Sequence, residues 1–430
     1  MSLRFGTDGV RGVALTELTT EFAASLGRAS AQALGGGRWL VGRDPRSSGA
    51  ELERAVASGL VSAGAEVVSL GVVPTPMLAW LSQQDGCPAA MVTASHNPWH
   101  DNGVKVFAAG GAKLSDEVEQ RIEAGIESSP IPMVDVPEVD ERHRYVAHLV
   151  DGRQRLDGLR VVIDCANGAM SVVAPEVFTA LGADAVVLHA DPDGRNINDA
   201  CGATHTDSLQ QAVVQHGAAL GLAFDGDGDR VIAVDHLGRV VDGDRLIAMS
   251  ALQRRDEGRL AHDTVVVTVM SNLGFHRAMQ AAGVQVVTTP VGDRHVLEAL
   301  EAGGFSVGGE QSGHVIHRDL ATTGDGLLAG LELVAYVQRR GRPLAELAES
   351  VMTRYPQVLV NVTVRERHPD AARQLAAEIE AAERSLGDGR VLVRASGTEP
   401  IVRVMVEAAT DQQAADVAHR LAAVVAERWA

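Results

Sequence analysis

Three aspartates alternate with glycines in the run Asp225-Gly226-Asp227-Gly228-Asp229. Because the glycines let the loop curl, the three carboxylates can converge on one cation. Two carboxylates about 4 Å apart repel by roughly 4 kcal/mol at an effective dielectric of about 20, so a cluster of three indicates a bound cation. Ligands that are all oxygen favour a hard ion, and Mg²⁺ suits a site shared with a phosphate. We therefore predict one Mg²⁺ per subunit at Asp225, Asp227 and Asp229.

Calcium-binding EF-hand loops open with the same alternation of aspartates, but the rest of this loop differs from theirs. An EF-hand has a glycine at its sixth position and a bidentate glutamate at its twelfth. Here those positions hold Arg230 and His236. The run therefore does not predict an EF-hand.

Ser95, in the segment Thr93-Ala94-Ser95-His96-Asn97-Pro98, is the candidate nucleophile or phosphoryl carrier. Serine and asparagine before a proline are ordinary turn residues, so this segment alone is weak evidence. The Gly-x-Ser-x-Gly signature of serine hydrolases does not occur around Ser95. The interpretation of Ser95 as a carrier is supported by its position after a predicted strand, because the three aspartates occupy the same position in the next unit. A phosphate on Ser95 would supply a fourth ligand to the metal ion.

Two further loops carry polar groups among small residues. The run Gly309–His314 offers Glu310 and neighbouring polar side chains between glycines, and it predicts contacts with sugar hydroxyls. We take its candidate sugar-binding residues to be Glu310, Ser312 and His314. The run Arg394–Glu399 combines cationic and hydroxyl groups with backbone N–H groups, which predicts a phosphate-binding loop. Its candidate phosphate-binding residues are Arg394, Ser396, Gly397, Thr398 and Arg403.

Several basic residues lie near these loops in the sequence, at Arg4, Arg11, Arg43, Lys105 and Arg230. A single arginine is more often a surface residue than a ligand. The exception is Arg11, which is the cation of the glycine-rich segment Gly6–Gly12. We expect Arg11 and Arg230 to stabilise charge on a phosphoryl group.

The elements that must position these loops form a repeated pattern. Short Val- and Leu-rich strands are predicted at 39–43, 161–164 and 264–269, and an Ala-rich helical stretch follows each of them. A glycine-containing turn then leads into a second strand, so each unit is a βαβ motif. A third strand in every unit runs into one of the polar loops described above. Open α/β sheets bind ligands at this carboxyl edge of their strands.

The last region departs from the pattern. It contains predicted strands at Val358–Val364, Val391–Arg394 and Ile401–Glu407 and predicted helices at Ala371–Leu386 and Gln412–Trp429. The predicted fold class is therefore α/β, with three related mixed α/β domains and a C-terminal α+β domain. We place the four domains at residues 1–150, 151–250, 251–356 and 357–430.

Composition narrows the class of protein. Hydrophobic residues make up 46% of the 430 residues but aromatic residues only 3%, which indicates a core of Ala, Val and Leu. A net charge of −18 argues against a nucleic-acid partner, which would need a basic face. The sequence contains no apolar run of the roughly 18 residues that a membrane span needs, so no membrane partner is predicted. Three scattered cysteines indicate reduced thiols, and we expect a cytoplasmic location.

Taken together and in this order, the motifs resemble those of the α-D-phosphohexomutase superfamily over the full chain. The opening Phe5–Gly12 and the loop that contains Gln311 resemble the branch that acts on glucosamine phosphates. The resemblance implies four domains around a central cleft. It also implies that Ser95 is a phosphoserine that binds Mg²⁺ together with the three aspartates. Glu310 and Ser312 would then contact the sugar, and Arg394–Thr398 would hold its non-reacting phosphate.

The resemblance further implies an isomerase that interconverts glucosamine 6-phosphate and glucosamine 1-phosphate through phospho-Ser95 and a hexosamine 1,6-bisphosphate. This step would feed UDP-N-acetylglucosamine and cell-wall precursor synthesis. Proton transfer would fall to Lys105 or His96. The alternatives are a phosphomannomutase or phosphoglucomutase of the same superfamily, a Mg²⁺-dependent phosphatase and a non-catalytic sugar-phosphate sensor. The sequence allows a homodimer but does not determine the oligomeric state.

Overall fold

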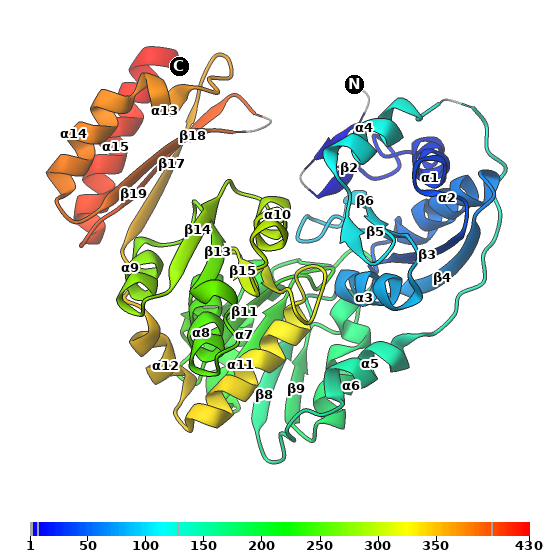
Figure 1. Ribbon diagram of the computed structural model, residues 1–430, viewed down its shortest axis with the longest axis horizontal. Coiled ribbons are helices and arrows are strands. Elements are labelled where there is room, and N and C mark those ends of the chain that lie inside the picture. Colours follow the sequence, from blue (N-terminus) through cyan, green and yellow to red (C-terminus); the bar gives the residue numbers. More distant parts are fainter. Residues whose placement is uncertain (1–2, 7, 128, 397–398) are drawn as a thin grey trace. The chain divides into compact units, whose positions relative to one another are not determined.

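The computed structural model describes residues 3–6, 8–127, 129–396 and 399–430. The chain divides into two compact units (Figure 1). The first unit comprises Met1–Met270 and Val284–Val351, and the second comprises Ser271–Gly283 and Met352–Ala430. Among the described helices, none is both long enough and apolar enough to cross a lipid bilayer.

The first sheet of the first unit has the strand order β1-β2-β6-β5-β3-β4, and β7 pairs with β6. Its strands are β1 (Phe5–Gly6), β2 (Gly9–Val13), β3 (Arg38–Arg43), β4 (Glu66–Val72), β5 (Ala89–Val92), β6 (Asp101–Ala108) and β7 (Ala112–Lys113). The helices of this part are α1 (Thr20–Leu34), α2 (Gly49–Ser62), α3 (Thr75–Asp85) and α4 (Asp116–Ala124).

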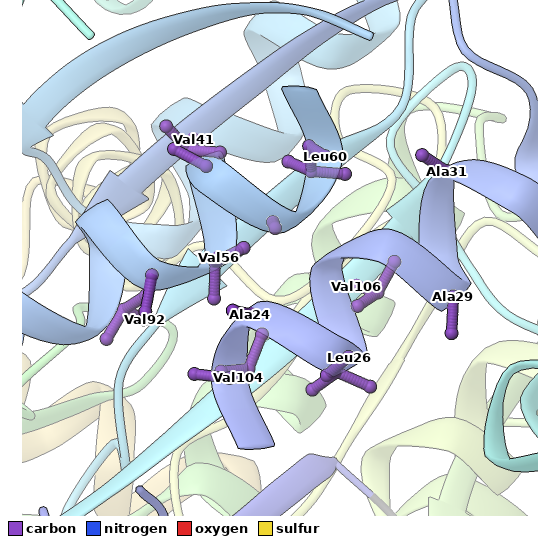
Figure 2. Packing of buried hydrophobic residues seen from close by; sticks show 14 of the residues in the cluster. Ala24, Leu26, Ala29, Ala31, Val41, Val56, Leu60, Val92, Val104 and Val106 are labelled. Atoms are coloured by element: carbon purple, nitrogen blue, oxygen red, sulfur yellow. The ribbon is translucent and has the colours of Figure 1, made fainter. Parts of the chain in front are cut away.

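The hydrophobic core of this part lies where α1 and α2 pack against the sheet (Figure 2). Gly27 of α1 and Gly59 of α2 let the two helices approach closely, because a Cβ at either position would overlap a carbonyl oxygen of the other helix. Ala24, Leu26, Val56 and Leu60 from the helices meet Val41, Val92, Val104 and Val106 from the strands. Small and branched side chains thus build this core, as the composition indicated.

The second and third sheets have the orders β12-β11-β10-β8-β9 and β14-β13-β15-β16. Their strands are β8 (Arg160–Asp164), β9 (Asp184–Leu188), β10 (Leu220–Phe224), β11 (Val231–Asp235), β12 (Val240–Val241), β13 (Thr264–Thr268), β14 (Gln285–Thr289), β15 (Val307–Gly309) and β16 (Val315–His317). The α-helices are α5 (Arg142–Val150), α6 (Ala174–Ala180), α7 (Asp207–Gln215), α8 (Gly243–Asp256), α10 (Asp293–Gly303), α11 (Gly326–Arg340) and α12 (Leu344–Val351). Short 3₁₀ turns occur at η1 (Ala169–Val172), η2 (Gly202–Thr204) and η3 (Ala261–Asp263).

One strand order recurs in all three sheets, as β4-β3-β5-β6, β9-β8-β10-β11 and β14-β13-β15-β16. The strand in the second place of each order, namely β3, β8 or β13, pairs in parallel with both of its neighbours. The strand in the last place, β6, β11 or β16, pairs antiparallel with the strand before it. The strands β5, β10 and β15 are therefore equivalent, and each runs into one of the polar loops. This arrangement confirms the predicted fold class of three related α/β domains.

The second unit contains an antiparallel sheet of order β17-β19-β18, with β17 (Gln357–Thr363), β18 (Arg390–Ala395) and β19 (Ile401–Glu407). Its helices include α13 (Ala371–Gln374), α14 (Ala376–Leu386) and α15 (Asp411–Trp429). The single helix predicted over Ala371–Leu386 is interrupted at Leu375, where φ is −107° and ψ is 17°. The predicted C-terminal α+β arrangement is thus present, with one helix in two pieces.

The helix α9 (Leu273–Ala281) belongs to the second unit, although it lies between β13 and β14 in the sequence. Asn272 caps it by accepting a hydrogen bond from Gly274 N, while its amide nitrogen donates to Tyr355 O and Glu407 Oε1, each at 2.9 Å. The third repeat therefore contributes its first helix to the C-terminal unit. The four domain boundaries drawn from the sequence stay predictions.

Candidate active site

The three aspartates of the β10–β11 turn are buried side by side. One carboxylate oxygen of each lies within 4.8 Å of the others, and none of the three residues is more than 3% exposed. Among the described residues, Asp227 Oδ1 and Asp229 Oδ1 have no hydrogen-bond partner. Leaving a buried acceptor unpaired costs about 1–3 kcal/mol, and more when it is charged. This oxygen-only set therefore fits a hard divalent cation such as Mg²⁺.

Ser95 lies against this triad. Its Oγ donates to Asp225 Oδ2 at 2.6 Å, and His96 Nδ1 lies 3.4 Å from the same Oγ. The φ of Ser95 is 53°, a left-handed conformation that costs a non-glycine residue roughly 1–2 kcal/mol. A Cβ at Gly226 would lie 2.6 Å from Ser95 O, so glycine at this position allows the two loops to meet. The structure thus joins the loops after β5 and β10 into one site.

Lys105, on β6, is the buried cation beside the triad. Its Nζ lies 2.8 Å from Asp227 Oδ2, 3.0 Å from Asp229 Oδ2 and 2.8 Å from Asp8 Oδ2. Burial opposes the ammonium charge, but the three carboxylates outweigh it and hold the pKa of Lys105 well above its usual value. Lys105 is therefore protonated in this arrangement.

Asp8, which the sequence reasoning missed, connects several cations of the site. Its carboxylate pairs with Arg11 Nη2 at 2.6 Å and with Lys113 Nζ at 3.1 Å, in addition to Lys105. Burial opposes its ionisation, but these cations hold the pKa of Asp8 well below its usual value. Its place beside Arg11 in the glycine run was the signal that could have identified it.

His96 and Arg230 lie near the triad, and both line the cavity that is described below. Burial, together with the positive charges of Arg230 and Arg11, lowers the pKa of His96 to about 4, so the ring is neutral at pH 7. Burial opposes the charge on Arg230, but Asp229 and Asp225 outweigh this effect and raise its pKa. The two candidates for proton transfer, His96 and Lys105, thus differ in protonation.

The loop after β15 brings Glu310 and His314 to the same region. Glu310 Oε1 accepts from Gly292 N at 3.0 Å. His314 is buried, with Nδ1 3.6 Å from Asp229 Oδ1 and Nε2 3.7 Å from Asp293 Oδ2. Burial opposes its charge, but the two carboxylates raise the pKa of His314. Ser312 of the same loop is exposed.

A cavity of about 370 Å³ opens between these loops. Its lining includes Arg11, His96, Asp229, Arg230, Glu310 and His314. The volume falls in the range of small-molecule sites, and the mixture of guanidinium and carboxylate groups suits a polar, anionic ligand. A larger cavity of about 470 Å³, lined by His148 of α5 and Leu328 and Leu331 of α11, contains none of the described candidate residues. We therefore take the smaller cavity as the candidate active site.

The predicted phosphate-binding residues lie in the second unit. Arg394 on β18 and Arg403 on β19 are direct cross-strand partners, and Arg403 Nε is buried without a hydrogen-bond partner in the described part of the chain. Burial and the charge of Arg403 lower the pKa of Arg394. Like charges directly opposite each other destabilise a sheet, so this pair favours a bound anion. Ser396, which directly follows β18, is buried. Gly397 and Thr398 lie outside the described residues.

Sequence reasoning missed three further residues at the site. The Thr75 hydroxyl, at the start of α3, donates to Asp227 Oδ2 at 2.6 Å. Lys113 and Asp293 form an ion pair that connects β7 with the start of α10. No local motif marks these residues, because each partner lies more than a hundred positions away in the chain. Arg43, by contrast, pairs with Glu53 and Glu138 and does not line the cavity.

Comparison with known proteins places these features in a family. Models of the phosphoglucomutase/phosphomannomutase family match as α/β/α domain I at residues 2–130, domain II at 143–238, domain III at 242–355 and the C-terminal domain at 359–424. A phosphoglucosamine mutase from Frankia alni is 55% identical, over 99% of this chain and 98% of that protein.

Solved structures agree with this result. A phosphoglucomutase/phosphomannomutase family protein from Burkholderia thailandensis is 28% identical, with a TM-score of 0.82 over 98% of this chain and 97% of that one. An N-acetylphosphoglucosamine mutase from Aspergillus fumigatus, solved in complex with GlcNAc-6P and magnesium, is 21% identical and has a TM-score of 0.72 over 99% of this chain and 96% of that one, which shows a shared fold. The chain therefore belongs to the phosphoglucomutase/phosphomannomutase family, in which it groups with the phosphoglucosamine mutases.

Proposed function

We propose that this isomerase interconverts glucosamine 6-phosphate and glucosamine 1-phosphate, with Ser95 as the phosphoryl carrier. The observation that carries the proposal is the 2.6 Å contact between Ser95 Oγ and Asp225 in a buried triad of carboxylates. A hydroxyl held at a cation site is suited to giving and receiving a phosphoryl group. The sugar is proposed from the relatives, which are phosphoglucosamine mutases.

The reaction has two balanced transfers. In the first, the bond from phosphorus to Ser95 Oγ breaks and a bond to the free 1-hydroxyl of glucosamine 6-phosphate forms, so that hydroxyl loses its proton and Ser95 Oγ gains one. The product is glucosamine 1,6-bisphosphate, which turns in the cavity. In the second transfer Ser95 Oγ takes the 6-phosphoryl group and loses its own proton, while the 6-oxygen gains one. We assign these proton transfers to His96 or Lys105, which both lie at the contact between Ser95 and the triad.

The remaining roles follow from charge and position. Asp225, Asp227 and Asp229 would hold Mg²⁺, which supplies positive charge to the oxygens of the transferring group. Arg11 and Arg230 line the cavity and add further positive charge there. Glu310 and His314 line the same cavity and are proposed sugar contacts, together with Ser312. Arg394, Ser396 and Arg403, with Gly397 and Thr398, are proposed to bind the non-reacting phosphate.

The place of this reaction in the cell follows from the substrate. Its product would feed UDP-N-acetylglucosamine and cell-wall precursor synthesis. A cytoplasmic location and a small-molecule hexosamine phosphate as partner remain predictions, and a homodimer remains a possibility that the sequence allows.

The test combines intact-mass spectrometry with activity. After incubation with a hexose 1,6-bisphosphate, the wild type should gain the mass of one phosphoryl group, and Ser95→Ala should not. Ser95→Ala should also lose nearly all conversion of glucosamine 6-phosphate, whereas Ser30→Ala, which removes another buried serine hydroxyl, should keep it. Activity of Ser95→Ala within tenfold of the wild type would exclude Ser95 as the carrier. Release of inorganic phosphate in place of glucosamine 1-phosphate would indicate a phosphatase.

A further inference from the structure

A buried arginine holds the main chain of the Ser95 loop, residues 93–101, from the inside. Arg46 follows β3, and its Nη2 donates to Ser95 O at 2.9 Å and to Asn97 O at 2.8 Å. Its Nη1 donates to Pro98 O and, at 3.1 Å, to Asp101 O. Since Nε donates to Asp44, all five N–H groups of this guanidinium are used. Four of the five bond to main-chain oxygens of the one loop that carries Ser95.

Asp44 connects Arg46 to the N–H group of Ser95. Its Oδ2 accepts from Arg46 Nε at 2.9 Å and from the Thr93 hydroxyl at 2.6 Å. The Thr93 oxygen in turn accepts from Ser95 N at 2.9 Å. The side chains of Arg46 and Asp44 are fully buried, so water does not compete for these bonds. Both the N–H and the carbonyl of Ser95 are thus connected to the same buried ion pair.

Asn198 holds the same loop from the second sheet. It lies after β9, and its Nδ2 donates to Ser95 O at 2.9 Å and to Asn97 O at 3.1 Å. Its own backbone is fixed by a hydrogen bond from Asn198 N to Ala166 O at 2.9 Å. The Ser95 carbonyl therefore accepts hydrogen bonds from both Arg46 and Asn198.

We propose that Arg46 and Asn198 are positioning residues that fix the main chain of Ser95 and thereby keep its Oγ against the aspartate triad. Neither side chain lines the cavity, so neither is placed to contact the substrate. The left-handed φ of Ser95 makes such support necessary, because this conformation is unfavourable for serine without surrounding bonds. The inference rests on the proposed role of Ser95 as carrier.

The expected effect is on the rate of phosphoryl transfer. A displacement of about 1 Å at a reacting atom can cost about a hundredfold in rate. Asn198→Asp keeps the size of the side chain and its tolerance of the positive φ of 58° but removes both N–H donors. Arg46→Lys keeps the charge but has three donors in place of five. Each variant should lower kcat at least tenfold and leave KM within about threefold, because the sugar and phosphate contacts are untouched.

Matched controls separate positioning from a general loss of structure. Asn167→Asp changes a neighbouring asparagine with a φ of 45°, whose amide donates to Asn196 O at 3.4 Å and not to the Ser95 loop. Arg254→Lys changes another buried arginine, which pairs with Asp319 at 2.8 Å. Both controls should keep kcat within twofold of the wild type.

The decisive measurement is a single turnover. Protein phosphorylated at Ser95 is mixed with saturating glucosamine 6-phosphate, and the loss of phosphoserine is followed by rapid quench and intact-mass spectrometry. Transfer at least tenfold slower in Asn198→Asp than in Asn167→Asp would support the proposal. Transfer within twofold of the wild type, or a raised KM at an unchanged rate, would overturn it. If Arg46→Lys does not fold, Asn198→Asp decides the question. Failure of the wild type to transfer phosphate from Ser95 would instead overturn the proposed function.

Discussion

Replacing Lys105 with methionine removes the buried cation beside the triad and keeps most of the side-chain length. Lys105 Nζ lies 2.8–3.0 Å from carboxylate oxygens of Asp227, Asp229 and Asp8. Each contact corresponds to about 6 kcal/mol of attraction at an effective dielectric near 20, but desolvation of the charged groups offsets most of this sum. Removing one partner of a buried ion pair costs about 3–5 kcal/mol. We expect Lys105→Met to lose about this much free energy of unfolding in EDTA.

Magnesium should change this result in a defined direction. In the wild type, Lys105 and a divalent cation are attracted to the same carboxylates and repel each other. Without Lys105, Mg²⁺ should bind at least tenfold more tightly, which corresponds to about 1.4 kcal/mol. Saturating Mg²⁺ should then restore part of the lost stability, because a ligand that binds the folded state stabilises it. Asp227→Asn removes a ligand instead, so it should weaken both Mg²⁺ binding and the Mg²⁺ dependence of activity.

Urea unfolding in EDTA and in MgCl₂, together with calorimetric titration by Mg²⁺, measures these effects. Arg254→Met is the control, because it removes a different buried cation that pairs with Asp319, outside the triad. Its loss of stability should be equal in EDTA and in Mg²⁺. Weaker or equal Mg²⁺ binding by Lys105→Met, or a stability loss below about 1 kcal/mol in EDTA, would refute the reasoning.

Three further predictions concern phosphate, sugar and pH. Arg394→Ala should raise KM for glucosamine, glucose and mannose phosphates by a similar factor, because it removes uniform phosphate binding; altered discrimination at an unchanged KM would place this loop at the sugar ring. The Gln311 amide nitrogen lies 3.2 Å from Asp244 Oδ2; Gln311 is not itself among the residues that line the cavity, but it directly follows Glu310, which is, and we predict that its side-chain oxygen accepts from a sugar ammonium. A charge-assisted bond of about 1.5–3 kcal/mol predicts roughly 10- to 150-fold selectivity in kcat/KM for glucosamine over glucose phosphate, which Gln311→Met should reduce; a wild type that prefers glucose or mannose phosphate would contradict it. Burial raises the pKa of Asp325 from 3.8 to about 6. The stability that the protonated carboxyl contributes is therefore complete below pH 3.8 and is lost as the pH rises through 6. Asp325→Asn should therefore exceed the wild type in stability by up to about 3 kcal/mol at pH 8 and match it near pH 4 in urea titrations, and no gain at pH 8 would count against this assignment.

Local pattern was sufficient for much of the fold. Val- and Leu-rich strands followed by glycine turns predicted β3, β8 and β13 and the equivalence of β5, β10 and β15, because strand and turn preferences are local properties of the chain. The grouping of the three aspartates was predictable for the same reason, since Asp225, Asp227 and Asp229 come from one short loop and could hold a metal ion together. The prediction that Ser95 is the candidate carrier required only its place after β5, the strand equivalent to β10.

Tertiary structure decided the rest. Lys105 lies in the middle of β6, and nothing in its neighbours along the chain indicates that three carboxylates surround it. The position of α9 in the second unit depends on Asn272 meeting Tyr355 and Glu407. Arg46 and Asn198 reach the Ser95 loop from positions about 50 and 100 residues away. The sequence by itself therefore predicted the recurring strands and the grouping of polar residues within single loops, whereas the compensation of buried charge and the support of Ser95 arise only when the folded chain removes distant polar groups from water and pairs them.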